Sequence, residues 1–228
     1  MTRVLVGMLV VALGALLIWT MLGLPAPSGR VPALVAAHLN ESGVAHDVTA
    51  VLLNFRGYDT LLEIGVLLLA VLGVLAVRLA AADTGGTLPP PPGALLRAFT
   101  NLVVPLMVLV AGYLLWAGAH RPGGAFQAGA VLAAAGVLLR LSGRLPALLP
   151  PRFWLRAGLL LGFAVFLAVA LGVTVAGDSL LEYPPAQAGA WITLIEATLT
   201  VSIGLILVSL FVGAPAPPGE AGSRGGDA

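Results

Sequence analysis

The stretch "GAHRPGGAFQAGAVLAAAG", from Gly118 to Gly136, decides how this chain is organised. Its Pro122–Gly124 segment separates two apolar runs, and a proline followed by paired glycines predicts a tight turn between two helices. Ala125, Gly129 and Ala133 recur every four residues, so the second helix would present a face of small side chains. Such a face allows another helix to approach closely within a membrane. That helix could come from this chain or from a partner, and the sequence leaves both open.

The composition of the whole chain indicates a membrane protein. Hydrophobic residues occupy 59% of the 228 positions and charged residues 9%. About a quarter of the residues of a soluble domain are charged. We therefore expect an all-α integral membrane protein, because a helix satisfies its own backbone groups in lipid. The net charge of +1 gives no reason to expect a nucleic-acid partner. The absence of cysteine excludes disulfides, thiolate metal sites and thiol redox motifs.

Six apolar stretches are long enough, or nearly so, to cross a bilayer, which takes about 20 residues. They are Val4–Leu24, Leu61–Leu79, Leu102–Ala119, Ala125–Leu141, Trp154–Val175 and Ala190–Val212. The first could be a signal peptide, but it is longer than a usual signal core, and the following "LPAPSG" is a poor cleavage site. We expect six transmembrane helices in two groups, two and then four.

The arginines orient these predicted spans, because cytoplasmic loops carry an excess of basic residues. Eight arginines would lie on one side, at Arg3, Arg78, Arg97, Arg140, Arg144, Arg152, Arg156 and Arg224, and three on the other, at Arg30, Arg56 and Arg121. This distribution predicts that both termini are cytoplasmic. It also predicts that Glu63, Glu196 and the turn at Pro122–Gly124 share the outer half of the membrane.

A proline-rich segment divides the chain. The sequence "DTGGTLPPPPG", residues 83–93, contains four consecutive prolines, and such a run is typical of a stiff polyproline connector. It is either an ordinary loop or a junction between two units. The second interpretation gives a two-helix unit at 1–82, a linker at 83–94 and a four-helix unit at 95–212. The remaining residues, 213–228, have the composition of a disordered tail.

Ionisable residues near the second predicted span are candidates for function, because charges are costly inside a membrane. On a continuous helix Arg56, Asp59 and Glu63 would share one face, and Arg56 would pair with Asp59. Alternatively Gly57 breaks the helix, and Asp59 or Thr60 caps a new one. Glu63 would lie about one turn inside that helix. It would then either reach up to the interface or take part in a charge relay.

The last predicted span carries a polar stripe formed by Thr193, Glu196, Thr200 and Gly204 on one helical face. Glu196 lies roughly 9 Å beyond Ala190 along the axis, which is too deep for its side chain to reach water easily. It should therefore face protein or water. The sequence allows a neutral acid that holds helices together, or a carboxylate that exchanges protons or cations.

Several residues of the opening stretch complete the set of candidates. We expect the turn and its packing face to be built from Pro122, Gly123, Gly124, Phe126, Gln127 and Gly129. Gln127 is a polar side chain in the opening turns of the helix, which makes it a candidate gate or hydrogen-bond bridge. His120 is more typical of a residue at the membrane interface, and we assign it no function.

At these residues the chain resembles a known family. "PGGAFQAG", followed by "AVLAAAGVLL", resembles the "PGGGFQGG" signature of the MnhB-like family, the B-type subunits of the Mrp-type multisubunit sodium/proton antiporters. "LIEATLTVSIGLILVSLF" is similar to the last helix of that family. The resemblance implies that residues 95–212 form a four-span MnhB-like unit. Ala125 and Ala128 stand where the family has glycines, which narrows the room for close backbone contact.

A second resemblance covers Asp47–Val77. "DVTAVLLNFRGYDTLLEIGVLLLAVLGVLAV" resembles a segment at the C-terminal end of the large, A-type antiporter subunit and in the E-type subunit of membrane-bound hydrogenases. Asp59 and Glu63 are retained from that pattern, and Leu62 replaces one glycine.

Together the resemblances imply a subunit of a proton- or sodium-translocating assembly in the cell (inner) membrane, related to the membrane arm of respiratory complex I. Its partners would be other subunits, membrane lipid, and Na⁺ or H⁺ as transported ions. The pumping subunits of such assemblies are larger and carry buried lysines, so this lysine-free chain would be accessory. The alternatives are a redox-driven complex and a purely structural subunit. We expect no enzymatic chemistry, cofactor or metal site.

Overall fold

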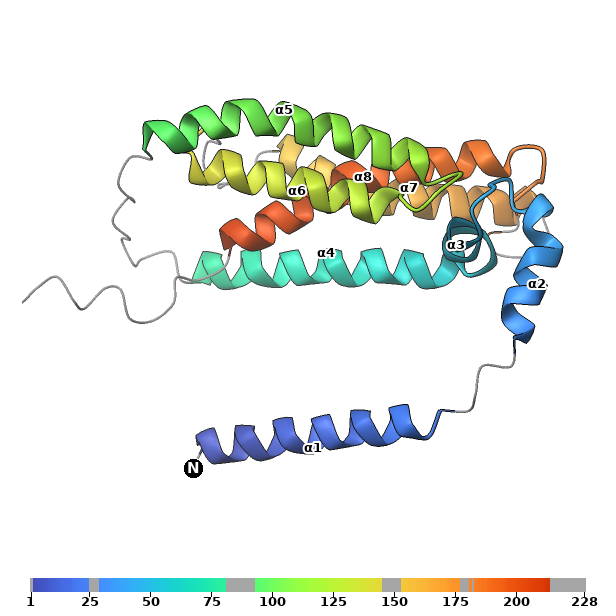
Figure 1. Cartoon of the computed structure of the whole chain (residues 1–228), viewed down its shortest axis with the longest axis horizontal. Helices are drawn as coiled ribbons and strands as arrows, with labels where there is room; N and C mark the ends of the chain where they lie inside the picture. The colour runs from blue at the N-terminus through green and yellow to red at the C-terminus, as the bar shows by residue number, and fades with distance from the viewer. Residues whose placement is uncertain are drawn as a thin grey trace, which may run out of the picture. The chain divides into compact units, whose positions relative to one another are not determined.

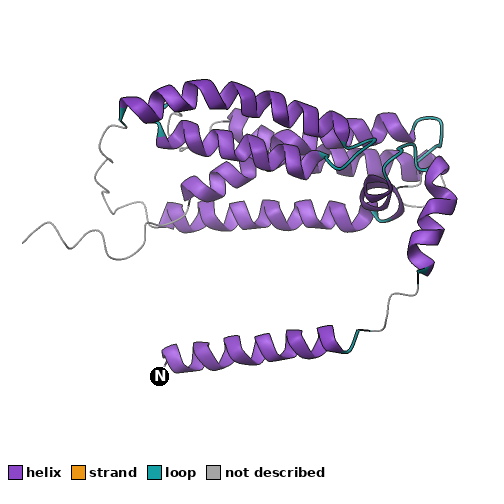
Figure 2. Cartoon of the chain, viewed as in Figure 1, coloured by secondary structure: helices purple, strands orange, loops and turns teal. Residues whose placement is uncertain are grey.

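The computed structural model describes residues 2–24, 29–80, 93–144, 153–176, 181 and 183–213. Within these residues all the regular secondary structure is helical (Figure 2). The chain forms two compact units, residues 1–37 and 38–228, and each is described by itself. Residues 83–92 of the predicted linker (83–94) and residues 214–228 of the predicted tail (213–228) lie outside the described residues. Of the rest, Gly93 is the N-cap of the helix that begins at Ala94, and Gly213 ends the last described helix.

The first unit contains α1 (Thr2–Leu22) and most of α2 (Arg30–His38). The Val4–Leu22 part of α1 has a mean hydropathy of 2.5, and none of its most apolar window is buried. Bulky apolar side chains such as Leu9 and Trp19 are exposed along it. A helix of this kind requires lipid or another protein around it.

The second unit is a helical bundle (Figure 1). Its longer helices are α4 (Gly57–Ala80), α5 (Ala94–Ala117), α6 (Ala125–Leu141), α7 (Phe153–Ala176) and α8 (Ala188–Gly213). Short elements precede α4: a 3₁₀ turn (Leu39–Glu41), α3 (Asp47–Ala50) and a π-helix (Val51–Phe55).

The long helices confirm an all-helical, multi-pass membrane protein. Five of them, α1, α4, α5, α7 and α8, are long and apolar enough to cross a bilayer, whereas the apolar helix α6 has 17 residues. α5 begins at Ala94, eight residues before the predicted span, and continues through Pro105. Proline is tolerated in membrane helices because neighbouring groups satisfy the freed carbonyl.

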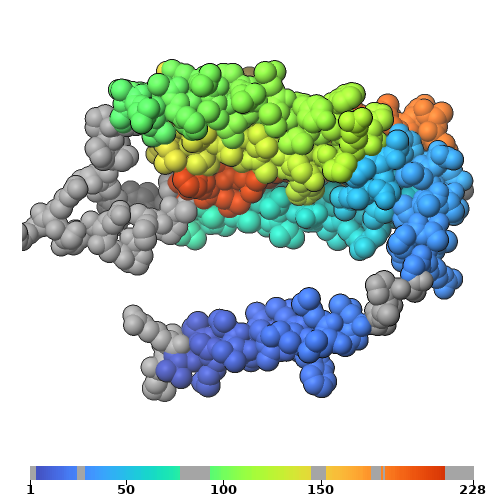
Figure 3. Space-filling model, viewed as in Figure 1, coloured from blue at the N-terminus to red at the C-terminus, as the bar shows by residue number. Residues whose placement is uncertain are grey.

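Helix α8 is the centre of the second unit, because it packs against α4, α5, α6 and α7. About three-fifths of its most apolar window, 61%, is buried within the chain. In Figure 3 the red part of α8 is visible as a strip between α6 (yellow) and α4 (teal). Helices α5 and α6 form one packed pair, α4 and α7 form another, and α8 joins the two.

The small-residue face of α6 is covered by α8, which answers the question left open by the sequence. A methyl group added at Gly129 would lie 2.8 Å from Cγ2 of Ile203. One added at Gly204 would lie 3.2 Å from Cβ of Leu132 and 3.4 Å from the Gly129 carbonyl oxygen. The two glycines therefore bring the backbones of α6 and α8 together, as small residues do at membrane helix contacts. This partner helix comes from the same chain.

The turn between α5 and α6 reverses the chain within residues 118–124. The Gly124 N–H donates to the Leu114 carbonyl at 2.8 Å, so the turn folds back onto the last turn of α5. Gly124 has φ 109° and ψ −171°, a backbone region that is essentially restricted to glycine. A methyl group at Gly123 would lie 2.5 Å from the Leu114 carbonyl oxygen. Both glycines are required by the geometry of the turn.

The chain before α4 is interrupted, as in the second of the two sequence interpretations. The π-helix ends at Phe55. Arg56 follows with a φ of −130° and a ψ of 30°, which are not helical, and α4 begins at Gly57. Arg56 forms the expected ion pair with Asp59, at an exposed position. The Thr60 hydroxyl donates to the Leu52 carbonyl at 2.6 Å, so it stabilises the π-helix instead of capping α4.

Candidate functional site

Glu196 is a buried acid in the centre of the bundle. It lies in the N-terminal half of α8, and 4% of its surface is exposed. Its flanking neighbours Ile192, Ile195 and Leu199 are fully buried. Carboxyl groups are almost never buried to this degree without polar partners, so the surroundings of this side chain decide what it does.

The carboxyl group of Glu196 lies against the N-terminus of α6. The Ala125 N–H donates a hydrogen bond to it. A methyl group at Gly124 would lie 2.7 Å from Oε1 of Glu196, and one at Gly118 would lie 3.2 Å away. The two glycines therefore make the space that the carboxyl group occupies. A helix N-terminus stabilises negative charge through its free N–H groups and its dipole, which offsets part of the cost of burial.

A cavity of about 240 Å³ lies beside this carboxyl group. It is lined by Val48, Thr49, Leu52, Leu53, Thr60, Glu63, Gly123, Gly124, Ala125, Phe126, Gln127, Glu196 and Leu199. We call it the Glu196 cavity. A water molecule occupies roughly 30 Å³ in the liquid, so the cavity has room for several. Five of its lining side chains are polar, and they come from α3, α4, α6 and α8.

The structure brings together part of the site expected from the sequence. Glu63, Phe126, Gln127 and Glu196 line one cavity together with the glycines of the turn. Glu63 is exposed, so it lies at the outer margin of the cavity while Glu196 is buried. The two acids and the turn therefore lie around one cavity, and their place in the outer half of the membrane stays a prediction.

Four other candidates lie elsewhere. Arg56 and Asp59 pair with each other on the surface and do not line the Glu196 cavity. Thr193 is exposed and lines a separate cavity of about 490 Å³ that also contains His120. Thr200 is buried, but its hydroxyl donates to the backbone carbonyl of Glu196 at 2.8 Å. The four residues of the stripe on α8 therefore do not form one site. Thr193 lies beyond the helix contacts that bury Glu196.

Two further threonines line the cavity that the sequence did not single out as candidates for the ion path. Thr49 is buried, and its hydroxyl donates to the Gly118 carbonyl at 2.5 Å. Thr60 is also buried and lines the same cavity. In a regular helix the side chains return to the same face every 3.6 residues, and the π-helix between these threonines disturbs that repeat. The available signal was weaker: both are hydroxyl residues within largely apolar runs.

We expect that replacing Thr60 with valine destabilises the π-helix and that replacing it with serine does not. Valine has the shape of threonine but cannot donate to the Leu52 carbonyl, and the loss of one hydrogen bond costs about 0.5–1.5 kcal/mol. Hydrogen–deuterium exchange of residues 51–56 in the purified protein would measure this. Thr198, an α8 residue outside the Glu196 cavity, provides the control variant Thr198→Val. Equal exchange in the Val and Ser variants of Thr60 would contradict the assignment.

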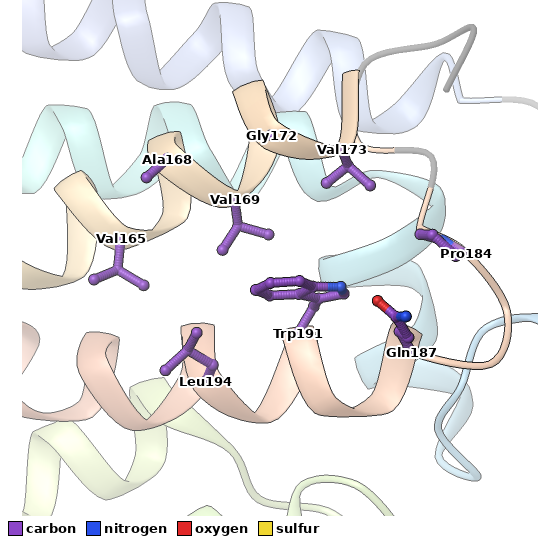
Figure 4. Close-up of a pocket in the computed structure, with 9 residues that line it drawn as sticks. All are labelled: Val165, Ala168, Val169, Gly172, Val173, Pro184, Gln187, Trp191 and Leu194. Atoms are coloured by element: carbon purple, nitrogen blue, oxygen red, sulfur yellow. The ribbon is translucent and has the colours of Figure 1, made fainter. Parts of the chain in front are cut away.

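A second cavity, of about 370 Å³, lies between α7 and α8 on a different face of α8 (Figure 4). The side chains of Val169 and Val173 on α7 point toward the indole of Trp191 on α8. Gln187 is the polar side chain in the lining, which otherwise consists of Val165, Ala168, Val169, Gly172, Val173, Pro184, Trp191 and Leu194. None of these lining residues carries a charge, so the Glu196 cavity is the better candidate for an ion site. Among the described residues no group of His, Asp and Glu side chains could hold a metal.

A family model described as "Domain related to MnhB subunit of Na+/H+ antiporter" matches residues 95–216. A search of curated proteins gives no match.

Two solved structures are similar to this chain. The first is a chain of the membrane-bound sulfane sulfur reductase, an archaeal respiratory membrane complex, with 23% identity and a TM-score of 0.70. The match covers 93% of this chain and 97% of that one. The second is a chain of the Mrp complex from Dietzia sp. DQ12-45-1b, with 22% identity and a TM-score of 0.69. It covers 93% of this chain and 26% of that one, so this chain spans about a quarter of its length. At these identities the matches establish a shared fold.

Proposed function

The chain belongs to the family of domains related to the MnhB subunit of Na⁺/H⁺ antiporters, and from this premise we propose that its Glu196 cavity forms part of an ion path. The chain acts as an accessory subunit of a multisubunit antiporter-type membrane complex, and protons or Na⁺ ions pass through or beside the cavity. The buried carboxyl group at the N-terminus of α6 carries this proposal, because a glutamate beside a cavity with room for several water molecules can bind and release a cation.

The proposed topology has six spans with both termini in the cytoplasm. With 17 residues, α6 is about 26 Å long at 1.5 Å per residue, slightly less than the bilayer core of about 30 Å. The turn at residues 118–124 precedes α6 and lies against the end of α5. It therefore adds the length that α6 lacks to cross the bilayer core. In this orientation Glu63 and Glu196 face the outer half of the membrane, and the eight-to-three arginine distribution supports it.

The proposed division of the chain is a two-helix unit at 1–82 and an MnhB-like unit at 95–212. The family match beginning at residue 95 supports the second part. The first part contributes Thr49, Thr60 and Glu63 to the cavity. The ion path thus requires both parts, and neither would conduct alone.

The proposed partners are the other subunits of a hetero-oligomeric complex, and the subunit performs no covalent chemistry of its own. The exposed apolar surface of α5, with residues such as Leu102 and Leu109, is available to lipid or to such subunits.

A second candidate function is membership of a redox-driven complex. The archaeal respiratory complex contains a chain of similar length that matches almost end to end, which favours this alternative. Purification of the native assembly distinguishes the two, because a redox-driven complex would copurify with an iron–sulfur or nickel subunit.

The proposed ion path is tested first at Glu63, which lies at the exposed margin of the Glu196 cavity. Replacing Glu63 with glutamine removes a charge from the exposed side of the cavity, so we expect exchange to slow several-fold while the complex still assembles. The measurement is Na⁺-dependent dissipation of a pH gradient in everted vesicles that contain the whole complex. Glu41→Gln is the matched control, because Glu41 is an exposed acid that pairs with His38 and does not line the cavity. Equal rates in both variants would count against the path.

A further inference from the structure

We infer that His46 and Thr49 form a proton connection between the water at the surface of the bundle and the Glu196 cavity. This inference rests on the proposed ion path and assigns its entrance. Neither residue belongs to the candidates expected from the sequence.

The outer part of the connection is His46. The Nδ1 atom of His46 lies 3.3 Å from the hydroxyl oxygen of Thr49, within hydrogen-bond range. Its side chain is 15% exposed, so the ring touches water on one edge and protein on the other. Imidazole suits this position, because it takes up and releases protons near neutral pH and has two nitrogens through which they can pass.

The inner part of the connection is Thr49, of which 5% is exposed. Its hydroxyl donates to the Gly118 carbonyl at 2.5 Å, and its side chain lines the Glu196 cavity. Gly118 is itself one of the glycines against which the Glu196 carboxyl group lies. Thr49 therefore contacts the histidine on one side and the cavity on the other.

The backbone holds His46 in this place. The N–H groups of Ala45 and His46 both donate to the Ala119 carbonyl, at 2.9 and 3.1 Å. The Asn54 side-chain amide donates to the Ser42 carbonyl at 3.0 Å, which ties the same segment to the π-helix. The loop that carries His46 is thus attached to the α5–α6 turn and to the π-helix before α4, and residues of both line the cavity.

The proton transfers balance without another reactant. A proton from outside binds Nε2 of His46, and the Nδ1 proton of the resulting imidazolium passes to the Thr49 oxygen. The Thr49 hydroxyl turns from the Gly118 carbonyl toward water in the cavity and releases its own proton to that water, which delivers a proton to the Glu196 carboxylate. His46 is then neutral with its proton on Nε2, and exchange with bulk water resets the tautomer. The reverse sequence returns a proton to the surface.

The charged surroundings of His46 are simple. Asp47 Oδ1 lies 3.9 Å from Nε2 of His46 and is mostly exposed. His120 and Arg121 belong to the turn that holds the loop, and both are exposed. Asp47 is therefore the charged group in contact with the ring among the described residues.

The other two histidines provide matched controls. His38 is exposed and pairs with Glu41 at 3.3 Å. His120 lies against Trp116, with ring centroids 6.0 Å apart, and lines the separate cavity that contains Thr193. Neither is shown in contact with a residue that lines the Glu196 cavity, so neither should share the behaviour of His46.

The test compares the dependence of exchange on external pH in proteoliposomes that contain the whole complex. We expect His46→Gln to slow exchange several-fold and to change the pH profile, whereas His38→Gln and His120→Gln leave the profile unchanged. Thr49→Val should reproduce the loss, and Thr49→Ser should restore both rate and profile because it keeps the hydroxyl.

The outcomes separate this inference from the proposed ion path. Normal rates and an unaltered pH profile in His46→Gln, in a complex that still requires Glu196, would overturn the connection and leave the path intact. A complex that exchanges normally without Glu196 would overturn both. Equal loss in the Ser and Val variants of Thr49, with an unaltered pH profile, would assign Thr49 to packing and overturn its part in the connection.

Discussion

Replacing Glu196 with glutamine is expected to abolish ion exchange by the assembled complex. Glutamine keeps the size and can still accept the hydrogen bond from the Ala125 N–H, but it cannot bind or release a proton. Positioned acid–base groups contribute rate factors of about 10² or more, so the remaining activity should lie near background. The measurement is gradient dissipation in everted vesicles, with the level of assembled complex determined in parallel.

The control for this variant lies on the same helix. Ser209 is a buried polar residue of α8 far along the chain from the cavity, and Ser209→Ala should retain exchange. Glu196→Asp is informative in a different way, because it keeps the carboxyl group but withdraws it from the α6 N-terminus. We expect partial activity from it. Normal exchange in Glu196→Gln, at normal assembly, would reduce this chain to a scaffold and place conduction in its neighbours.

Replacing Gly124 with alanine is expected to destabilise the bundle and to displace Glu196. The added methyl group would lie 2.7 Å from Oε1 of Glu196. The φ of 109° adds a backbone cost of about 1–3 kcal/mol for any residue other than glycine. Both effects fall on the contact between α8 and the turn. Thermal unfolding of the purified complex, together with its exchange rate, would measure the loss.

Gly112→Ala is the matched control for the turn variant. Gly112 lies within α5, and a methyl group there would meet nothing within 4 Å. Alanine also favours the helix over glycine, so this variant should be as stable as the wild type or slightly more stable. If Gly124→Ala unfolded at the same temperature as Gly112→Ala and exchanged normally, the close contact at the turn would be wrong.

Much of this architecture was predictable from the sequence, because membrane insertion imposes a strong constraint on composition. The apolar runs located the helices, and α6 has the predicted bounds. Proline and glycine located the α5–α6 turn. Glu196 was identified because a lone acid in a long apolar helix is conspicuous.

Other features depend on three-dimensional packing and left little trace in the sequence. Helix α8 is apolar on nearly every side, so its periodicity gave no sign that it is the central helix. Thr49 and Thr60 line the same cavity although a π-helix lies between them, and no residue pattern predicted that π-helix. Thr193 was grouped with Glu196 from helical spacing alone, although only the latter lies deep enough to be covered by α6.

The central position of α8 also has a consequence for how the protein is made. The ribosome delivers helices in chain order, and α8 emerges after the other four helices of its bundle. Until then the α5–α6 pair and the α4–α7 pair lack the element that joins them, and the small face of α6 is open to lipid. The compact bundle can therefore form only after the last of its helices has entered the membrane. During synthesis the surfaces that α8 later covers are therefore exposed to lipid or to the insertion machinery.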